Sequence, residues 1–358
     1  MAPMKRTRFR ATIATALVLV LGAVPARPSD VTAATRPRLY QIDIGVNVFW
    51  NSLTVNQFNP AKLTIRAGDS VRWTNVVLRQ PQTVTFGPPL VTPPLIPQPD
   101  NAEVNPTVIK PQGGRVVGDV STDVFSSGAL VSGMTGLPAS YTFTFPKPGL
   151  YLYRSLFHPA MSGEIDVVAA GQPASTTVDH GPTMYDALKG AGEVLGRVQA
   201  YARRAAANPG DVEIEVGGGT PAISFNQFYP PGVTVSISTT VTWNCRETSG
   251  DPHALVFGSL TTAEQDGTVP LYTGQAADGG LTINPDYATP SVPSGTRVLT
   301  DTFSEADTLY TSGLLYGSFI NYPSITPARY SLTFRSLGQF YYYDPFHPGM
   351  QGVVTVVP

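Results

Sequence analysis

Cysteine, charged residues and histidine are all scarce in this chain of 358 residues. The single cysteine, Cys245, excludes an internal disulfide, so the fold must be stabilised by burial of apolar side chains. Only 13% of residues are charged and 42% are hydrophobic, which excludes a disordered chain. Lys and Arg number 23 against 25 Asp and Glu, so the basic surface that nucleic acid requires is missing and no nucleic-acid partner is expected.

Glycine and proline are abundant, with 34 of each. Because these residues cost about 1 and 3 kcal/mol per helical position, long helices are disfavoured. Short alternating segments separated by Gly and Pro turns are typical of strands, as in residues 63–66, 71–74, 141–145, 330–334 and 353–357. The pattern predicts an all-β protein built from β-sandwiches.

The first residues read as a targeting segment. Basic residues at 5, 6, 8 and 10 precede an apolar run over residues 13–24, and Val24-Pro25-Ala26 offers a small-residue cleavage pattern. Twelve helical residues span roughly 18 Å, too short for a ~30 Å hydrocarbon core. We expect residues 1–26 to be a signal peptide and the mature chain, without a transmembrane span, to be periplasmic or extracellular. The alternative is an uncleaved anchor.

An internal repeat organises the rest of the chain. Asn56-Gln57-Phe58-Asn59-Pro60 recurs at residues 226–230, and Val71-Arg72-Trp73 recurs at residues 241–243, both at an offset of 170. The longest match joins residues 149–163 to residues 338–352, at an offset of 189. The larger offset indicates longer loops in the second copy.

Two homologous domains follow, at residues 40–168 and 213–358, with a linker at 169–212. Within the linker, a helix is predicted at about 183–207. Its apolar positions recur at helical spacing and are Met184, Leu188, Ala191, Leu195, Val198, Ala202 and Ala205. This helix is either a connector laid over a sandwich edge or a partner-binding element. Residues 87–113, rich in proline, and 258–300 form long loops of undecided role.

The longest repeated motif has the form Gly-x-x-x-Tyr-x-x-x-x-His-x-x-Met-x-Gly. It resembles the C-terminal copper loop of the cupredoxin family, the blue copper fold of plastocyanin and its relatives. The resemblance covers both domains and implies two tandem cupredoxin-like Greek-key β-sandwiches joined by one amphipathic helix. In that family an upstream His joins a Cys, a His and a Met of this loop around one copper ion.

In the second domain, the resemblance places His253, His347 and Met350 at the two His positions and the Met position, while Asp344 replaces the Cys. Two imidazoles and a carboxylate suit Cu(II) or Zn(II), but a blue copper centre depends on a thiolate. The resemblance therefore implies one copper ion held here without a normal electron-transfer site. The alternative is a vestigial site in which Asp344 hydrogen-bonds the histidines.

The first domain carries a poorer version of the same site, made of Gln82, Ser155, His158 and Met161. Gln82 and Ser155 are neutral, so we interpret this set as degenerate. Cys245 could enter a rearranged electron-transfer site, but a buried apolar role is commoner for a lone cysteine.

The chain has four histidines, too few for the trinuclear copper cluster of the two-domain oxidases, and it lacks the common hydrolase and phosphate-loop motifs. We therefore expect a non-enzymatic protein that binds copper in its second domain. The alternatives are a metal-free structural module that presents its long loops to an unknown protein partner, and an electron carrier with a rearranged site.

Overall fold

The structure is a computed structural model that is mostly β. Within its described residues, no helix is long and apolar enough to cross a membrane. It describes residues 36–48, 52–88, 95–97, 102–104, 110–111, 120, 122–134, 136–158, 160–176, 185, 189–197, 199–200, 203, 212–220, 222–246, 251–257, 272–275, 281–298, 310–316 and 329–358. The predicted signal peptide and the uncleaved-anchor alternative both lie outside these residues.

A nine-stranded sheet runs through both halves of the chain, in the order β19-β21-β15-β12-β13-β2-β1-β4-β9. The first half contributes β1 (Leu39–Val48), β2 (Leu53–Asn59), β4 (Ser70–Asn75) and β9 (Ser140–Thr144). The second half contributes β12 (Val212–Thr220), β13 (Ile223–Tyr229), β15 (Thr240–Asn244), β19 (Thr296–Val298) and β21 (Arg329–Phe334).

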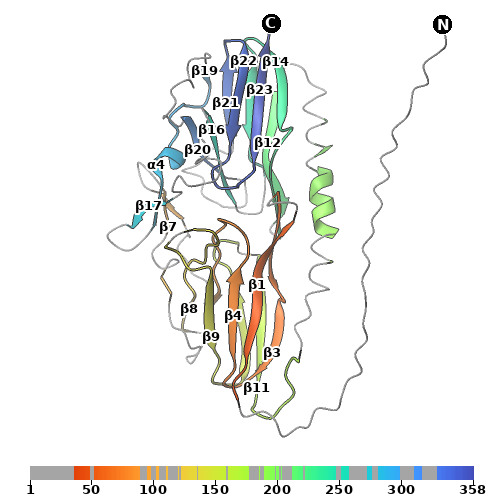
Figure 1. Cartoon of the computed structure of the whole chain (residues 1–358), viewed down its shortest axis with the longest axis vertical. Helices are drawn as coiled ribbons and strands as arrows, with labels where there is room; N and C mark the ends of the chain where they lie inside the picture. The colour runs from red at the N-terminus through yellow and green to blue at the C-terminus, as the bar shows by residue number, and fades with distance from the viewer. Residues whose placement is uncertain are drawn as a thin grey trace, which may run out of the picture. The chain divides into compact units, whose positions relative to one another are not determined.

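Each half adds a five-stranded sheet of its own. The first sheet has the order β3-β11-β10-β5-β8, from Lys62–Arg66, Ser162–Val168, Gly149–Arg154, Thr85–Phe86 and Phe125–Ser126. The second has the order β14-β23-β22-β16-β20, from Gly232–Ser236, Gln351–Val357, Gly338–Tyr343, Pro252–Phe257 and Tyr310–Tyr316. Figure 1 shows β14, β22 and β23 side by side in the second half. Each strand of the first sheet is equivalent, in the internal repeat, to the strand at the same place in the second sheet.

The two hydrophobic cores lie between the shared sheet and each five-stranded sheet. Trp73 on β4 packs edge-on against Tyr153 on β10, with 5.3 Å between ring centroids. Trp243 on β15 packs in the same way against Tyr342 on β22, also at 5.3 Å. All four side chains are buried, because alternation along each strand turns one face inward.

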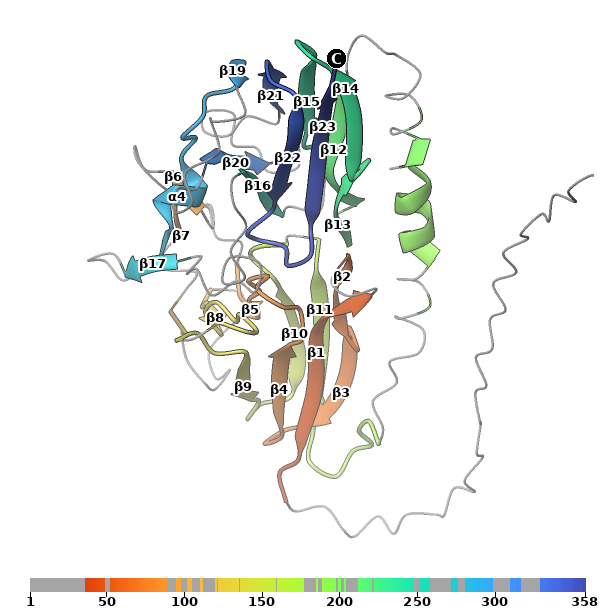
Figure 2. The ribbon, with the colours of Figure 1, turned by 45° about the horizontal axis from the view of Figure 1, so that its top comes forward.

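The seam between the halves is an antiparallel pairing of β2 with β13 (Figure 2). The register places Leu53 opposite Phe225 and Val55 opposite Ile223, with Thr54 opposite Ser224 at the centre. Since these residues are equivalent in the internal repeat, the seam has local two-fold symmetry.

The sequence predicted two sandwiches joined by one helix, and the seam corrects that prediction. Two sheets of separate sandwiches would each end at an edge, whereas β2 and β13 complete each other's hydrogen bonding. The backbone N–H groups of Asn56 and Asn226 each donate across the seam, to the carbonyls of Ala222 and Ser52, at 2.8 Å.

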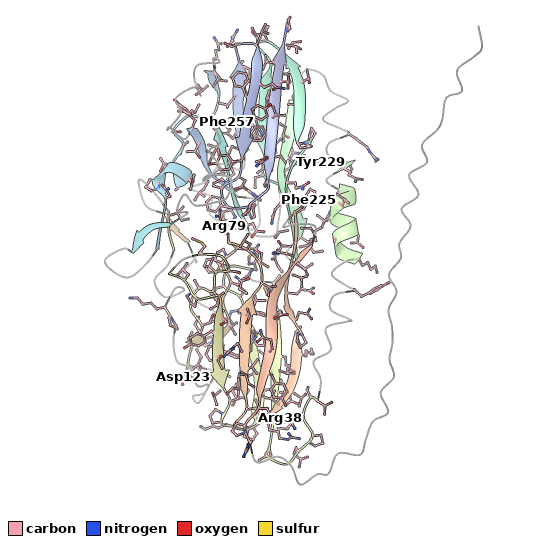
Figure 3. The ribbon with its side chains drawn as sticks, in the orientation of Figure 1. Arg38, Arg79, Asp123, Phe225, Tyr229 and Phe257 are labelled. Atoms are coloured by element: carbon pink, nitrogen blue, oxygen red, sulfur yellow. The ribbon has the colours of Figure 1, made fainter. Side chains whose placement is uncertain are left out.

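The predicted linker helix covers this seam. Residues 189–197 are helical, while much of the predicted 183–207 range lies outside the described residues. Ala191 and Val194 are buried in a cluster with Leu53, Val55, Ile223 and Phe225, so the helix lies over both halves at once. Figure 3 shows Phe225 beside the helical segment. A Cβ on Gly190 would come within 2.7 Å of Ile223, so this glycine permits the close approach.

The two long loops also meet. Strands β6 (Leu95–Pro97) and β7 (Ala102–Val104) come from the first loop, and β17 (Tyr272–Gln275) and β18 (Leu281–Ile283) come from the second. β7 pairs with β18, which makes a small four-stranded sheet that both halves share. The short helix α4 (Pro285–Ala288) follows β18. The described parts of these loops therefore contact each other.

The packing of the helix gives a test with a matched control. Val194 is 1% exposed and Leu195 is 38% exposed, although the predicted stripe contained Leu195 and not Val194. Val194→Ala should lower the free energy of unfolding by about 2 kcal/mol, from lost burial and a small cavity. Leu195→Ala should change it by less than about 0.5 kcal/mol. Urea denaturation measures both, and equal losses would contradict the observed face of the helix.

Candidate metal centre

The second half brings two histidines and an aspartate together at one end of its five-stranded sheet. His253 lies near the start of β16, whose other end carries Phe257 in the core (Figure 3). Asp344 follows β22 directly, and His347 lies in the turn before β23. Two backbone hydrogen bonds close this turn, from Met350 N–H to the His347 carbonyl and from Asp344 N–H to the Met350 carbonyl, both at 3.0 Å.

One carboxylate oxygen is the centre of the group. Asp344 Oδ2 lies 2.6 Å from His253 Nδ1 and 2.9 Å from His347 Nδ1, and both nitrogens donate to it. The other oxygen, Oδ1, accepts the backbone N–H of Phe346 at 2.8 Å, which fixes the plane of the carboxylate. One ligand atom from each of the three residues lies within 4.8 Å of the others.

The group is buried, and its electrostatics favour an anionic aspartate. Burial opposes ionisation of Asp344 more than any other single effect. The charge of His347 and the hydrogen bonds from both histidines together outweigh it, so the pKa of Asp344 lies below its usual range. A buried anion between two imidazoles attracts a cation, and two nitrogens and an oxygen are donors that Cu(II) and Zn(II) accept.

A glycine in a β-bulge makes room for His253. Gly217 interrupts the register of β12 with β13 and has φ of +68°, a left-handed value that favours glycine. A Cβ at this position would lie 2.5 Å from His253 Nε2. The backbone of β12 therefore comes up against the imidazole in a way that a larger residue would prevent.

The remaining predicted residues of the second half have core positions. Met350 is 1% exposed and packs in the hydrophobic cluster around Trp243. Cys245 is buried in the same cluster. Within the described part of the chain, the candidate metal-binding group consists of His253, Asp344 and His347 and does not include this cysteine. Nothing there supports the rearranged thiolate site.

The degenerate set of the first half also assembles, as a hydrogen-bonded cluster. Gln82 Oε1 accepts the Ser155 hydroxyl at 2.9 Å and His158 Nδ1 at 3.1 Å. Met161 is buried in the core, and its backbone N–H donates to the His158 carbonyl at 2.8 Å. Gln82 Oε1 thus contacts Nδ1 of the loop histidine His158 in the way that Asp344 Oδ2 contacts Nδ1 of His347, but Gln82 carries no charge.

The two sets face each other across the seam through a residue that the sequence analysis missed. Asp251 Oδ1 lies 2.9 Å from His158 Nε2 and accepts Gln80 Nε2 at 2.5 Å. Asp251 is buried, and its pKa is lowered far below the usual range: burial opposes this most strongly, but His158 outweighs it, assisted by His347 and Ser224. The aspartate of one half thus contacts the loop histidine of the other.

A signal for Asp251 was present in the sequence. Gln80-Pro81-Gln82 and Asp251-Pro252-His253 are equivalent in the internal repeat, at an offset of 171. Residues two apart in extended chain point to the same side, so Asp251 and Gln80 lie on the face that carries His253 and Gln82. The first residue of each triplet could have been added to the site on that ground.

No family model matches this sequence, and no curated protein matches it. Among solved structures, it is similar to the Cu(I) form of a methionine-to-alanine mutant of amicyanin, with 17% identity and a TM-score of 0.23 over 38% of this chain and 89% of that one. The reduced Cu(I) form at pH 4 of a proline-to-glycine mutant of amicyanin matches with 17% identity and a TM-score of 0.23, over 41% and 97%. The similarity therefore spans a minor part of the chain.

The low pKa of Asp344 predicts how the protein responds to acid. Because this pKa is lowered on folding, the carboxylate stabilises the fold above its unfolded pKa, near 3.9, and the stabilisation is lost as pH falls through the folded value. At pH 7, Asp344→Asn should lower the free energy of unfolding by about 3 kcal/mol, since it removes the anion from two buried partners.

Urea denaturation at pH 7, 5 and 3 measures this effect, and the difference between wild type and Asp344→Asn should shrink below about pH 4. Asp123, which is exposed, provides the matched control. Asp123→Asn should leave stability within about 0.5 kcal/mol at every pH. A wild-type advantage that stays constant down to pH 3 would contradict an ionised Asp344.

Proposed function

We propose that this chain is an exported, non-catalytic protein of two cupredoxin-like Greek-key repeats, whose second repeat binds one copper ion through His253, Asp344 and His347. The observation that carries this proposal is the convergence of two imidazole Nδ1 atoms on one buried carboxylate oxygen. Export rests on the pattern of residues 1–26.

The three side chains would contribute differently to the binding of a divalent cation. Asp344 supplies the negative charge, and the N–H of Phe346 keeps its second oxygen in place. Each imidazole directs Nδ1 at the same point, so the cation would replace the Nδ1 protons as the positive partner of the carboxylate. Cu(II) bound by nitrogen and oxygen without a thiolate is a weakly coloured centre.

The surroundings of the site argue against an electron carrier. His253 and His347 are both buried, at 0% and 6% exposure, so the imidazoles are closed to a docking partner. The charge of His347 also helps to lower the pKa of Asp251, which belongs to the same half. A metal in this position suits a binding or stabilising role.

A metal-free structural protein is the second candidate function. It is favoured by the same carboxylate, because both imidazoles already donate to Asp344 and satisfy it. The pairing of β7 with β18 is consistent with it, since the described parts of the long loops join the two halves. A protein partner for the loops remains part of this second proposal.

Copper binding is tested by loading the mature protein with Cu(II) and recording absorption and EPR spectra. We expect one Cu(II) per chain with nitrogen hyperfine structure and no intense band near 600 nm, because the site lacks a cysteine thiolate. His347→Ala and His253→Ala should each abolish that signal. Met161→Leu, which changes the equivalent of Met350 in the first half, should leave it intact.

The melting temperature separates the two candidates. A ligand that binds only the folded state adds about 2.7 kcal/mol at 100 times its Kd, so Cu(II) should raise Tm by several degrees. The rise should vanish in His347→Ala. An unchanged Tm together with no bound copper would favour the metal-free protein, and an intense thiolate band would contradict both candidates.

A further inference from the structure

Three donor groups from both halves converge at a point separate from the His253, Asp344 and His347 group. Gln80 and His158 come from the first half and Asp251 from the second. The Gln80 amide nitrogen lies 3.2 Å from His158 Nε2 and 2.5 Å from Asp251 Oδ1, and His158 Nε2 lies 2.9 Å from the same oxygen. All three side chains are at least 95% buried.

The orientation of His158 is fixed from its other side. Gln82 Oε1 accepts both the Ser155 hydroxyl and His158 Nδ1, so Nδ1 carries a proton. A histidine whose Nδ1–H donates to an oxygen presents Nε2 as its metal-binding atom. Nε2 faces the Asp251 carboxylate at 2.9 Å, so one nitrogen and one oxygen that can bind a cation meet at the same point.

The Gln80 side chain favours a cation over a simple ion pair. An ion pair between His158 and Asp251 needs no third group, yet the Gln80 amide lies against both atoms. In its present orientation, Gln80 Oε1 is buried without a hydrogen-bond partner in the described part of the chain. Exchange of the amide nitrogen and oxygen would direct that oxygen to the same point, where it would be a third ligand.

Asp251 is held in place by further contacts. The Ser224 hydroxyl, at the centre of the seam, hydrogen-bonds this carboxylate and itself accepts Asn56 Nδ2 at 2.7 Å. The carboxylate is thus anchored by its own half and directed at the first half.

We propose that His158, Asp251 and Gln80 form a second binding site for a divalent transition-metal cation of the Zn(II) class, located between the two repeats. The ligand set is one imidazole nitrogen, one carboxylate oxygen and one amide oxygen, which Zn(II) accepts with a fourth position left for water. A cation here would join the two halves, because it takes ligands from both. This site shares no ligand with the proposed copper site.

The test counts Zn(II) ions in the full mature protein. Isothermal titration and elemental analysis after desalting should give two Zn(II) per chain. Asp251→Asn and His158→Gln should each leave one, with the affinity of the lost site reduced on the order of 100-fold or more. Asp344→Asn should also leave one, because it removes the other site. Loading with ¹¹³Cd should give two NMR resonances. Asp251→Asn and His158→Gln should remove the same resonance, and Asp344→Asn should remove the other.

Each outcome decides one of the two proposals separately. One Zn(II) that survives Asp251→Asn and His158→Gln but is lost in Asp344→Asn would overturn the second site and leave the first intact. One ion that survives Asp344→Asn but is lost in Asp251→Asn would do the reverse. His158→Gln retains an amide in place of the imidazole, so it tests the site even if Asp251→Asn fails to fold.

Discussion

The antiparallel pairing of β2 with β13 is the contact on which the rest of the molecule depends. It places Thr54 opposite Ser224 on a local two-fold axis and merges four strands of the first half and five of the second into one sheet. A sheet edge with unpaired N–H and C=O groups must be covered or paired, and here each repeat covers the edge of the other. The helix at 189–197 and the paired loop strands β7 and β18 then join the same two halves again.

The seam also decides what the histidine loops can do. In each half the loop lies at the end of its five-stranded sheet. Across the seam, Asp251, which directly precedes β16 in the second half, reaches His158 in the loop of the first half. Two ionised carboxylates and three imidazoles are thereby buried together. Buried charges are tolerated only when they are paired, so this region must contain protons or cations between its carboxylates and imidazoles.

Much of the fold could be predicted because the repeat is visible in the sequence. The predicted strands at 63–66, 71–74, 141–145, 330–334 and 353–357 each correspond to a strand of the structure, since alternation has a strong local cause. The face of the helix was predicted less well: Val194 and not Leu195 is buried, because the seam beneath the helix selects the buried positions. Asp344 and His347 could be predicted because they lie in the repeated loop, and His253 because the resemblance places a histidine upstream of that loop.

The sequence alone determined the tandem repeat, the strand-rich architecture and the absence of a cysteine thiolate at the Cys position of the loop, because each of these follows from residue identity and spacing along one chain. The tertiary structure alone decided that the halves share a sheet, that the imidazoles are enclosed, and that Asp251 and Gln80 belong with His158. The two contacts of Asp251, with His158 and with Gln80, join residues 93 and 171 positions apart in different halves of the chain. The pairing of β2 with β13 brings the two halves together, and no spacing along the chain specifies that pairing.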